Sequence, residues 1–353
     1  MIAPDPVDRL LLDEAPPAPE SVAIVDAPAL VGPVLERTDE VRVFCDDLRD
    51  AALVPQALLV GHPDELGGAQ LALARLPKSL AALDEIAVSV LGRDDLLLLA
   101  GGRVKHMHRS MNEVLAKYFT AVNASLGRQK SRVLRAWGPV EGATSNWPKR
   151  RHHEDLGFTV CAHGATFAGT KIDAGTRLLL RHLAPDGTDV LDFGCGNGSI
   201  AVHLARHGHR VTGVDVSWAA VAATQIAAAE NDVAVDAVWA DGTSGLPGGA
   251  FDAIVTNPPF HRGVAKDSDA TLALFDDAAR LLRPGGELWC VFNSHLPWRR
   301  ELGERLGPTR VVAQDPRYTV TVTAPRTRTH TTGRTQGVHR NGSDDGTTLK
   351  EAS

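Results

Sequence analysis

Short apolar runs alternate with stretches of helical periodicity over most of the second half of the chain. Runs of five or six mostly apolar residues, typical of strands in a parallel sheet, occupy 189–193, 210–215, 237–241, 251–256 and 287–292. Stretches with helical spacing separate them at 199–207, 219–230 and 270–283. This alternation predicts an α/β unit with a mostly parallel sheet. The last two apolar runs, 310–314 and 318–323, flank a short turn and predict a terminal β-hairpin.

The first half of the chain shows the same alternation less regularly. Residues 22–25, 41–44 and 96–99 have the apolar character of short strands, and residues 71–76 and 79–90 have that of helices. We therefore expect a second α/β unit ahead of the first.

Polar segments mark the borders of these two units. Residues 1–20 are rich in Pro, Asp and Glu, so we expect a flexible lead-in, and the almost complete lack of apolar residues after 324 predicts a disordered tail. A polar stretch between the halves predicts a linker. The expected division is a lead-in (1–20), an N-terminal domain (21–137), a basic linker (138–163), a second domain (164–324) and a tail (325–353).

Length and composition fit two domains and exclude several classes of protein. A chain of 353 residues corresponds to about two domains of ordinary size. No apolar run reaches the roughly 18 residues of a membrane-spanning helix, and the first residues lack the basic start and apolar core of a signal peptide. Four widely spaced cysteines, Cys45, Cys161, Cys195 and Cys290, indicate neither a disulfide framework nor a zinc site. We expect a cytoplasmic protein with no metal ion and no membrane partner.

The net charge of −6 conceals an uneven distribution of charge along the chain. Residues 1–100 contain seven basic and 18 acidic side chains, whereas residues 101–163 contain 11 basic and four acidic ones. The remainder, 164–353, is close to neutral. The total argues against a nucleic-acid partner, but the basic middle segment is compatible with contacts to phosphates.

A glycine-rich loop follows the first predicted strand of the second unit and precedes its first helix. Gly194, Gly196 and Gly198 allow the backbone to approach a ligand closely, and the helix N-terminus adds unpaired N–H groups. The loop fits a plain turn, a dinucleotide site or a site for S-adenosylmethionine (SAM). Its G-x-G-x-G spacing departs from the dinucleotide pattern G-x-G-x-x-G. Asp192 would repel a pyrophosphate but attract the sulfonium and ammonium groups of SAM, so we favour SAM.

Two more carboxylates follow strands at the same edge of the predicted sheet. Asp215 ends the second strand, where it can accept hydrogen bonds from both ribose hydroxyls, and Asp241 ends the third, where it can accept from the adenine amino group. Each alone is equally consistent with capping of the next helix. Together with the glycine loop they indicate a SAM site. This part of the chain resembles the class I SAM-dependent methyltransferases, whose second-strand motif is similar to Gly213–Ser217.

The fourth predicted strand of this unit ends in Asn257-Pro258-Pro259-Phe260. Two prolines stiffen this loop and lack N–H groups, so the Asn257 side-chain oxygen and the Pro258 carbonyl can both accept from one exocyclic amine. Phe260 offers a ring on which a planar base can stack. An ordinary proline-rich turn is the alternative, and the glycine loop upstream makes it the poorer explanation. A role for His261 as a helper is conceivable, but a loop histidine without a catalytic role is the simpler interpretation.

The tetrapeptide is similar to that of the amino-methyltransferases. As this resemblance implies, phenylalanine in the last position accompanies guanine N2 substrates, and tyrosine accompanies adenine or protein glutamine. The segment 164–180 resembles the one that precedes the catalytic domain of the ribosomal RNA guanine-N2 methyltransferases and lies over the SAM site there. The resemblance implies that Phe167 contacts the cofactor. Lys171 is a second candidate, although the start of a helix explains it equally well.

Segments of the first half, 76–79 and 100–108, resemble the N-terminal domain of the same family, which is a degenerate copy of the methyltransferase fold. In agreement, the first half has no G-x-G-x-G loop and no second Asn-Pro-Pro sequence. Residues around Lys105 and 130–132 are closer to the large-subunit branch of the family. The resemblance implies two class I methyltransferase domains with Rossmann-like sheets, of which 164–324 transfers a methyl group from SAM to guanine N2 of ribosomal RNA. The basic segment 101–163 is the expected RNA contact.

Two other functions are compatible with such a chain. A protein glutamine N5-methyltransferase would be favoured by a tyrosine at position 260 and by a helical N-terminal domain. A catalytically silent RNA-binding or ribosome assembly factor would keep the fold without the reaction. The residues that a silent protein would have been free to lose are intact: Asp192, Gly194, Gly196, Asp215 and Asn257.

Overall fold

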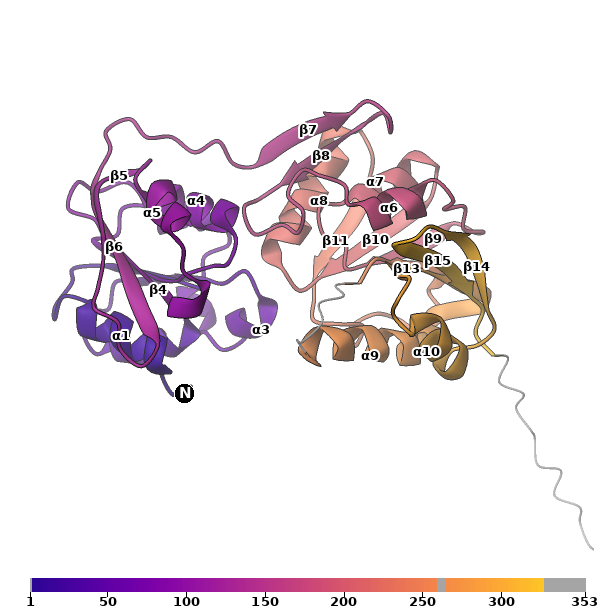
Figure 1. Cartoon of the computed structure of the whole chain (residues 1–353), viewed down its shortest axis with the longest axis horizontal. Helices are drawn as coiled ribbons and strands as arrows, with labels where there is room; N and C mark the ends of the chain where they lie inside the picture. The colour runs from indigo at the N-terminus through magenta and orange to yellow at the C-terminus, as the bar shows by residue number, and fades with distance from the viewer. Residues whose placement is uncertain (1, 259–264, 327–353) are drawn as a thin grey trace, which may run out of the picture.

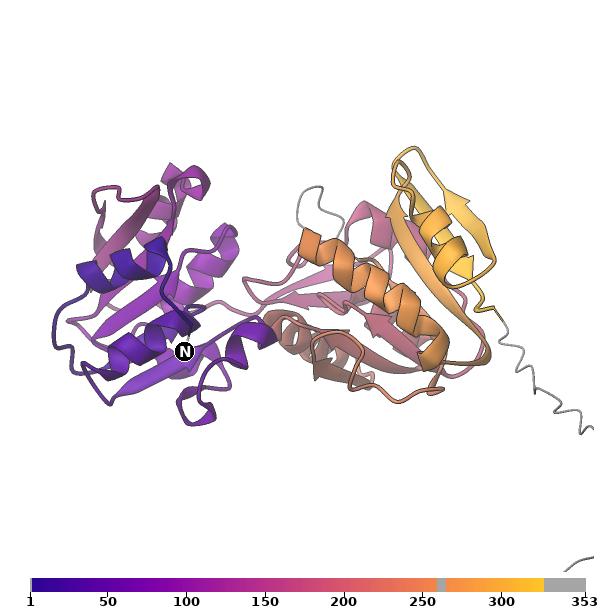
Figure 2. The same ribbon diagram turned by 90° about the horizontal axis from the view of Figure 1, so that it is seen from below.

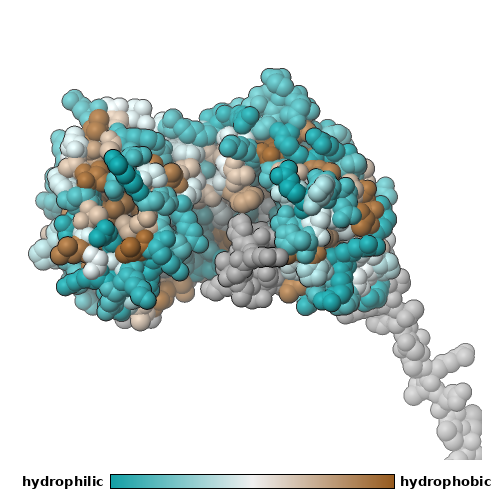
Figure 3. Space-filling model, viewed as in Figure 1, coloured by the Kyte–Doolittle hydropathy of each residue, from teal (hydrophilic) through white to brown (hydrophobic). Residues whose placement is uncertain are grey.

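The computed structural model describes residues 2–258 and 265–326, with the side chains of 265–270 left out. The chain forms two lobes that lie side by side, and each is built around one β-sheet (Figure 1). We call residues 6–139 the N-terminal lobe and residues 149–324 the C-terminal lobe. Both lobes have mostly hydrophilic surfaces, and the molecular surface is hollowed between them on the face shown in Figure 3.

The C-terminal lobe contains a seven-stranded sheet in the order β11-β10-β9-β12-β13-β15-β14. Neighbouring strands from β11 to β13 are parallel, and β15 and β14 are antiparallel, which confirms the predicted Rossmann-like sheet and terminal hairpin. The strands are β9 (Asp189–Phe193), β10 (Arg210–Asp215), β11 (Val235–Trp239), β12 (Phe251–Thr256), β13 (Leu282–Asn293), β14 (Thr309–Gln314) and β15 (Tyr318–Thr323).

Helices cover both faces of this sheet. Apolar side chains of α6 (Ala174–Leu180), α7 (Ser199–Arg206) and α8 (Trp218–Glu230) pack against one face. Those of α9 (Ala265–Leu281) and α10 (Trp298–Arg305) pack against the other, and Figure 2 shows α9 lying across it. Alternate residues of each strand therefore point into two separate cores.

The N-terminal lobe contains a six-stranded sheet in the order β2-β1-β3-β4-β6-β5. This is the order of the C-terminal sheet without its β11, with four parallel strands followed by two antiparallel ones. The strands are β1 (Val22–Val25), β2 (Val41–Phe44), β3 (Leu71–Arg75), β4 (Leu97–Arg103), β5 (Phe119–Ala124) and β6 (Ser131–Pro139). The shared strand order confirms the expectation that the first domain repeats the methyltransferase topology.

Helices also cover both faces of the N-terminal sheet. On one face lie α4 (Leu80–Ser89) and α5 (Arg109–Leu115), and on the other lie α1 (Pro6–Glu14), α2 (Val31–Leu35) and α3 (Leu48–Ala51). Four short 3-10 helices complete the lobe: η1 (Pro28–Leu30), η2 (Gln56–Leu58), η3 (Pro63–Leu66) and η4 (Val104–His106).

The prediction of a helix over 71–76 is wrong, because Leu71–Arg75 form the strand β3. This strand lies between β1 and β4 in the middle of the sheet, and its first four residues are buried. A strand covered on both faces has a continuous apolar run, and periodicity cannot distinguish such a run from a buried helix.

The prediction of a flexible lead-in over 1–20 is also wrong, because α1 packs on the N-terminal sheet. Asp5 caps this helix by accepting from the backbone N–H groups of Val7 and Asp8, and the Asp8 side chain accepts from the Asp5 N–H in return. The side chains of Val7, Leu10 and Leu11 are buried. Helical spacing of these few apolar residues outweighs the polar composition around them.

The polar stretch 138–163, predicted to be a weakly structured linker, contains a β-hairpin. Its strands are β7 (Lys149–His153) and β8 (Phe158–Ala162), and Phe158, Val160 and Cys161 are buried in the core of the C-terminal lobe. Only the segment 140–148, which we call the tether, connects the two lobes without a strand or helix of its own.

Candidate active site

The glycine loop lies between β9 and α7 and has the backbone conformation that glycine favours. Gly194, Gly196 and Gly198 have φ angles of 77°, 56° and 73°. A Cβ on Gly198 would lie 2.9 Å from the Cα of Thr224, so α7 and α8 leave no room there for a side chain. Gly194 and Gly196 face open space and line a cavity, so a ligand can approach the backbone at these two positions.

Asp192, in β9 just before this loop, is a buried carboxylate without an ion-pair partner in the described chain. Its side chain is completely buried, and no side chain among the residues that the structure describes donates a hydrogen bond to either oxygen. Burial raises the pKa of Asp192 to about 8, the nearby backbone N–H of Ala201 acts in the opposite direction, and the carboxylate of Asp215 makes a smaller contribution upward. An ionised carboxylate in such a place lacks a positive counterpart. A ligand with a sulfonium and an ammonium group would supply one, so the residues present fit SAM.

Asp215, at the end of β10, is tied to the glycine loop. Its carboxylate accepts from the backbone N–H of Gly196 at 3.1 Å and from that of Ser217 at 3.0 Å. Burial raises the pKa of Asp215, and the hydrogen bonds act in the opposite direction. The structure therefore brings Asp192, Asp215 and the loop together. The third strand was expected over 237–241, but β11 begins and ends two residues earlier, at Val235–Trp239. Asp241 therefore lies two residues beyond the end of the strand, and it is exposed.

The segment that precedes α6 lies against the glycine loop. The Asn197 amide donates to the backbone carbonyls of Gly169 and Lys171, both at 2.9 Å. Phe167 and Lys171 line a narrow cavity of about 40 Å³ together with Gly194, Gly196 and Asn257. The Phe167 side chain is nevertheless 61% exposed, so its ring is available to a ligand.

Asn257 follows β12 and has a fixed side-chain orientation. Its amide Nδ2 donates to the carboxylate of Asp173 at 3.1 Å and to the hydroxyl of Thr176 at 2.8 Å. That hydroxyl donates to the same carboxylate, so it can only accept from Asn257. Both partners therefore require the NH₂ group on their side, and the Asn257 oxygen, a hydrogen-bond acceptor, is turned away from them.

The rest of the tetrapeptide is only partly described. Pro258 is buried. The predicted catalytic residues Pro259 and Phe260 lie outside the described residues, as does His261.

Several residues that shape this site stand in no motif that the sequence predicts to be functional. Asp173 and Thr176 orient Asn257 across more than 80 positions of the chain, and Asn197 joins the loop to its covering segment. The signal for the first two was local, since Asp173 caps α6 in the pattern expected at a helix start. Their contact with Asn257 depends on the packing of α6 beside β12, which no local pattern contains.

The basic residues of the middle segment divide into paired and unpaired groups. Arg109, Arg128, Arg135 and Arg150 form ion pairs with acidic neighbours. Four others are exposed and have no ion-pair partner within the described chain: Lys105, Lys130, Arg132 and Arg151. Backbone pairing of 102–104 with 130–132 places the first three at one end of β4 and β6.

The described residues contain neither a candidate metal site nor a candidate membrane span. No group of three or more His, Cys, Asp or Glu side chains there is arranged to hold a metal ion. None of the described helices is long and apolar enough to span a membrane.

Comparison with known proteins gives consistent results for both lobes. The family profile described as "Methyltransferase small domain" matches residues 157–322, and the "RLMG N-terminal domain" matches residues 52–139. The chain is 34% identical over 265 residues to "Ribosomal RNA large subunit methyltransferase G" of Streptomyces avermitilis, covering 70% of this chain and 69% of that protein. The protein of the same description from Pseudomonas putida is 33% identical over 269 residues, covering 74% and 70%.

A solved structure is similar over nearly the whole length. The T. thermophilus 16S rRNA N2 methyltransferase RsmC, in complex with AdoMet and guanosine, superposes with a TM-score of 0.73 at 25% identity. The match covers 91% of this chain and 92% of the other, so it includes both lobes.

Proposed function

Because the chain belongs to the family of ribosomal RNA large subunit methyltransferase G, we propose that it transfers a methyl group from SAM to the exocyclic N2 amine of a guanine in ribosomal RNA. The observation that carries this proposal is the fixed orientation of Asn257, which presents an acceptor oxygen beside the cavity of the glycine loop. The relatives' names indicate RNA of the large subunit as the substrate.

SAM, when bound, supplies an electrophilic methyl group attached to sulfur. The Asn257 oxygen and the Pro258 carbonyl accept hydrogen bonds from the guanine amine and aim its lone pair at that methyl group. The amine nitrogen forms the new bond to carbon while the carbon–sulfur bond breaks, which gives S-adenosylhomocysteine. The amine then loses a proton to water, so no strong base is required. Phe260 stacks on the base that is taken into the pocket.

The cofactor is held by the residues around the glycine loop. Asp192 attracts its positive charge from beneath the loop, and the loop backbone at Gly194 and Gly196 approaches its amino-acid end. Asp215 accepts from the ribose hydroxyls, Asp241 accepts from the adenine amine, and Phe167 covers the site.

The two lobes have separate tasks in this proposal. The catalytic domain is 164–324, and the N-terminal domain is a degenerate copy that positions the RNA. The exposed basic side chains of 101–163 contact RNA phosphates. A substrate of this kind places the protein in the cytoplasm.

The test uses the full chain, methyl-labelled SAM and ribosomal RNA from a strain that lacks the protein. We expect label in N2-methylguanosine after nucleoside analysis, and mapping of that nucleoside in the two strains identifies the position. Label in protein would instead indicate a glutamine methyltransferase, and label in adenosine would also contradict the proposal. Calorimetric titration with SAM distinguishes a silent assembly factor, because such a factor would show no binding by the wild type, whereas we expect binding that Asp192→Ala removes.

A further inference from the structure

Two turns, one from each lobe, pack against each other at the interface. The first, 45–48, joins β2 to α3, and the second, 215–218, joins β10 to α8. The Leu48 N–H donates to the Val216 carbonyl at 3.0 Å, and the Trp218 N–H donates to the Asp46 carbonyl at 2.7 Å. The turns therefore form a short antiparallel bridge between the lobes.

The two turns occupy equivalent places in the two copies of the fold. Phe44 pairs with the last residue of β1, and Val214 pairs with the last residue of β9, so 45–48 corresponds to 215–218. Cys45 stands where the catalytic lobe has Asp215, so the N-terminal turn has no carboxylate at the position equivalent to the ribose ligand. The two backbone hydrogen bonds between the turns are nearly symmetric, because each joins the last residue of one turn to the second residue of the other.

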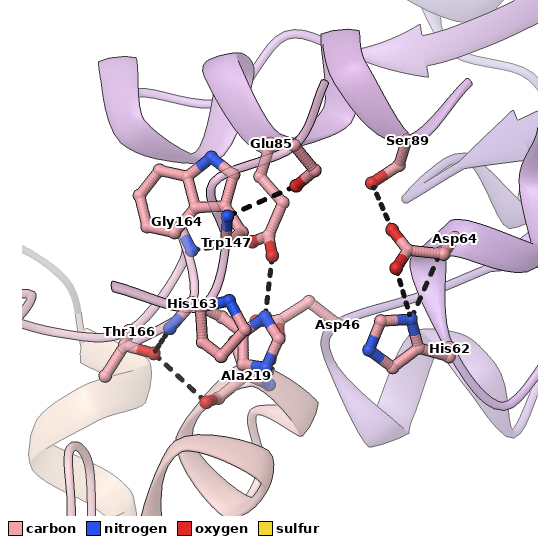
Figure 4. Close-up of polar contacts among 12 residues, drawn as sticks. Asp46, His62, Asp64, Glu85, Ser89, Trp147, His163, Gly164, Thr166 and Ala219 are labelled. Carbon is pink, nitrogen blue, oxygen red and sulfur yellow. Dashed lines mark hydrogen bonds and ion pairs between the residues drawn. The ribbon is translucent and has the colours of Figure 1, made fainter. Parts of the chain in front are cut away.

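The Asp46 carboxylate adds contacts that have no counterpart in the other turn. It accepts from the Ser217 hydroxyl at 3.0 and 2.9 Å and from the Ala219 backbone N–H at 2.8 Å (Figure 4 shows Asp46 beside Ala219). Ser217 is the N-cap of α8, so Asp46 acts as a second cap supplied by the other lobe. Asp46 is held in turn by Asp26, which accepts from its backbone N–H at 2.8 Å.

Trp218 anchors the same turn in the N-terminal lobe. Its ring meets the rings of Phe44 and His163 edge to face, with centroids 5.1 and 4.9 Å apart, and it packs against the core that α4 and α5 cover. His163 is itself bound to Glu85 of α4 at 2.6 Å (Figure 4). The position of residues 215–219 is thus defined as much by the N-terminal lobe as by the sheet to which they belong.

We infer that Asp46 is a positioning residue for the SAM site, which fixes the ribose-binding turn of the catalytic lobe from the N-terminal lobe. The inference rests on the proposed function, because it takes Asp215 as the ribose ligand. Asp215 is the first residue of the turn that Asp46 caps, and its carboxylate accepts from the Ser217 N–H, so a looser turn leaves this carboxylate less well placed. The lobe that lost the cofactor loop therefore still contributes to cofactor affinity.

The test is calorimetric SAM titration of the full chain with Asp46→Ala, Asp46→Asn, Asp215→Ala and the Asp46→Ala/Asp215→Ala double variant. We expect Asp46→Ala to raise the Kd for SAM roughly tenfold, as for a lost helix cap, and Asp46→Asn, which keeps one acceptor oxygen, to raise it less. In the Asp215→Ala background, Asp46→Ala should change the Kd by less than about twofold, because the two residues act through one contact. Asp13→Asn, at an exposed acid of α1, is the charge-matched control and should keep the wild-type Kd.

A purely structural role predicts a different set of results. Asp46→Ala and Asp46→Asn would then lower the melting temperature but leave the Kd of the folded protein unchanged, or the effects of Asp46→Ala and Asp215→Ala would add fully. Either result overturns the inference. If Asp46→Ala does not fold, the same comparison of single and double variants with Asp46→Asn in its place tests the inference. If the wild type does not bind SAM, the proposed function is overturned. If the wild type binds SAM and the Asp46 variants bind it with the same Kd, only this inference is overturned.

Discussion

At the scale of single residues, the burial of Asp192 disfavours the ionised form of its carboxyl group. Asp192 has a pKa of about 8 in the fold against 3.8 when exposed, because burial disfavours its charged form. Between these two values the folded state holds more protons than the unfolded state, so this residue makes the protein less stable as pH rises from about 4 to about 8.

Asp192→Asn removes this titration and should shift stability in a pH-dependent way. We expect the variant without cofactor to gain melting temperature relative to wild type, with a larger gain at pH 8 than at pH 5, and to lose SAM binding. The difference corresponds to a few kcal/mol, since each pKa unit is worth about 1.4 kcal/mol. Thermal unfolding at the two pH values measures it. Equal gains at both pH values would contradict the assignment of the pKa shift to Asp192.

The orientation of Asn257 explains why this position carries an amide and not a carboxylate. Asn257→Asp would place a second carboxylate against Asp173, and like charges at that distance repel. We expect Asn257→Asp and Asn257→Ala to lower kcat by about 10²–10³-fold, with a much smaller change in the Kd for SAM. Steady-state kinetics with saturating SAM checks this.

The double variant Asp173→Asn/Asn257→Asp is the matched control for that prediction. It restores one donor amide and one acceptor carboxylate across the same contact, so it should recover part of the kcat that Asn257→Asp loses. Lack of any recovery would show that Asp173 does not set the orientation of Asn257.

The residue types at the site could be predicted from the sequence, but the contacts between them could not. The glycines, Asp192, Asp215 and Asn257 stand in short local motifs at strand ends, and the topology of parallel strands brings strand ends together. The bonds of Asn257 to Asp173 and Thr176 join positions that are distant in the chain, and they follow from helix packing that no motif encodes.

At the scale of elements, the polar composition of a segment and the spacing of its apolar residues can lead to opposite predictions of secondary structure. The strands of the C-terminal sheet were predicted to within two residues at their starts, except β13, which begins five residues before the predicted run. In the N-terminal lobe, β3 was taken for a helix, and α1 was overlooked in a segment rich in proline and acids. Both misses have the same cause, because tertiary packing, and not local composition, decides whether a short apolar cluster is buried.

The helix α1 offers a direct test of that explanation. Asp5→Ala removes the cap that satisfies the N–H groups of Val7 and Asp8, and we expect it to lower the free energy of unfolding by about 1 kcal/mol. Denaturant unfolding monitors the loss. An unchanged midpoint, as expected for the same substitution at the exposed Asp94, would mean that α1 does not contribute to the stability of the lobe.

At the scale of the whole molecule, the lobes meet through a close approach at Gly164. A Cβ on this residue would lie 2.7 Å from the Ala81 carbonyl carbon and 2.8 Å from the Ala82 Cα, both in α4 of the other lobe. No sequence pattern marked this glycine as an interface residue, because the clash that excludes a side chain comes from the partner lobe.

Gly164→Ala should therefore push the lobes apart without disturbing either fold. We expect a loss of about 1–3 kcal/mol in stability, a larger radius of gyration by small-angle scattering and faster proteolysis of the tether. Gly303→Ala in α10, where a Cβ meets no neighbouring atom, is the control and should be neutral or stabilising. An unchanged radius of gyration for Gly164→Ala would show that α4 shifts locally to make room for the methyl group and that the lobes do not move apart.

The tether between the lobes has a consequence for how strong their interface must be. Residues 140–148 keep the turns 45–48 and 215–218 near each other, so their pairing takes place at an effective concentration in the millimolar range. A pair of separate proteins that forms a stable complex typically buries roughly 1,600 Å² of total surface in the interface. Tethered lobes are free of that requirement, so the backbone pairing of the two turns and the packing of Trp218 can hold the lobes together without a large interface.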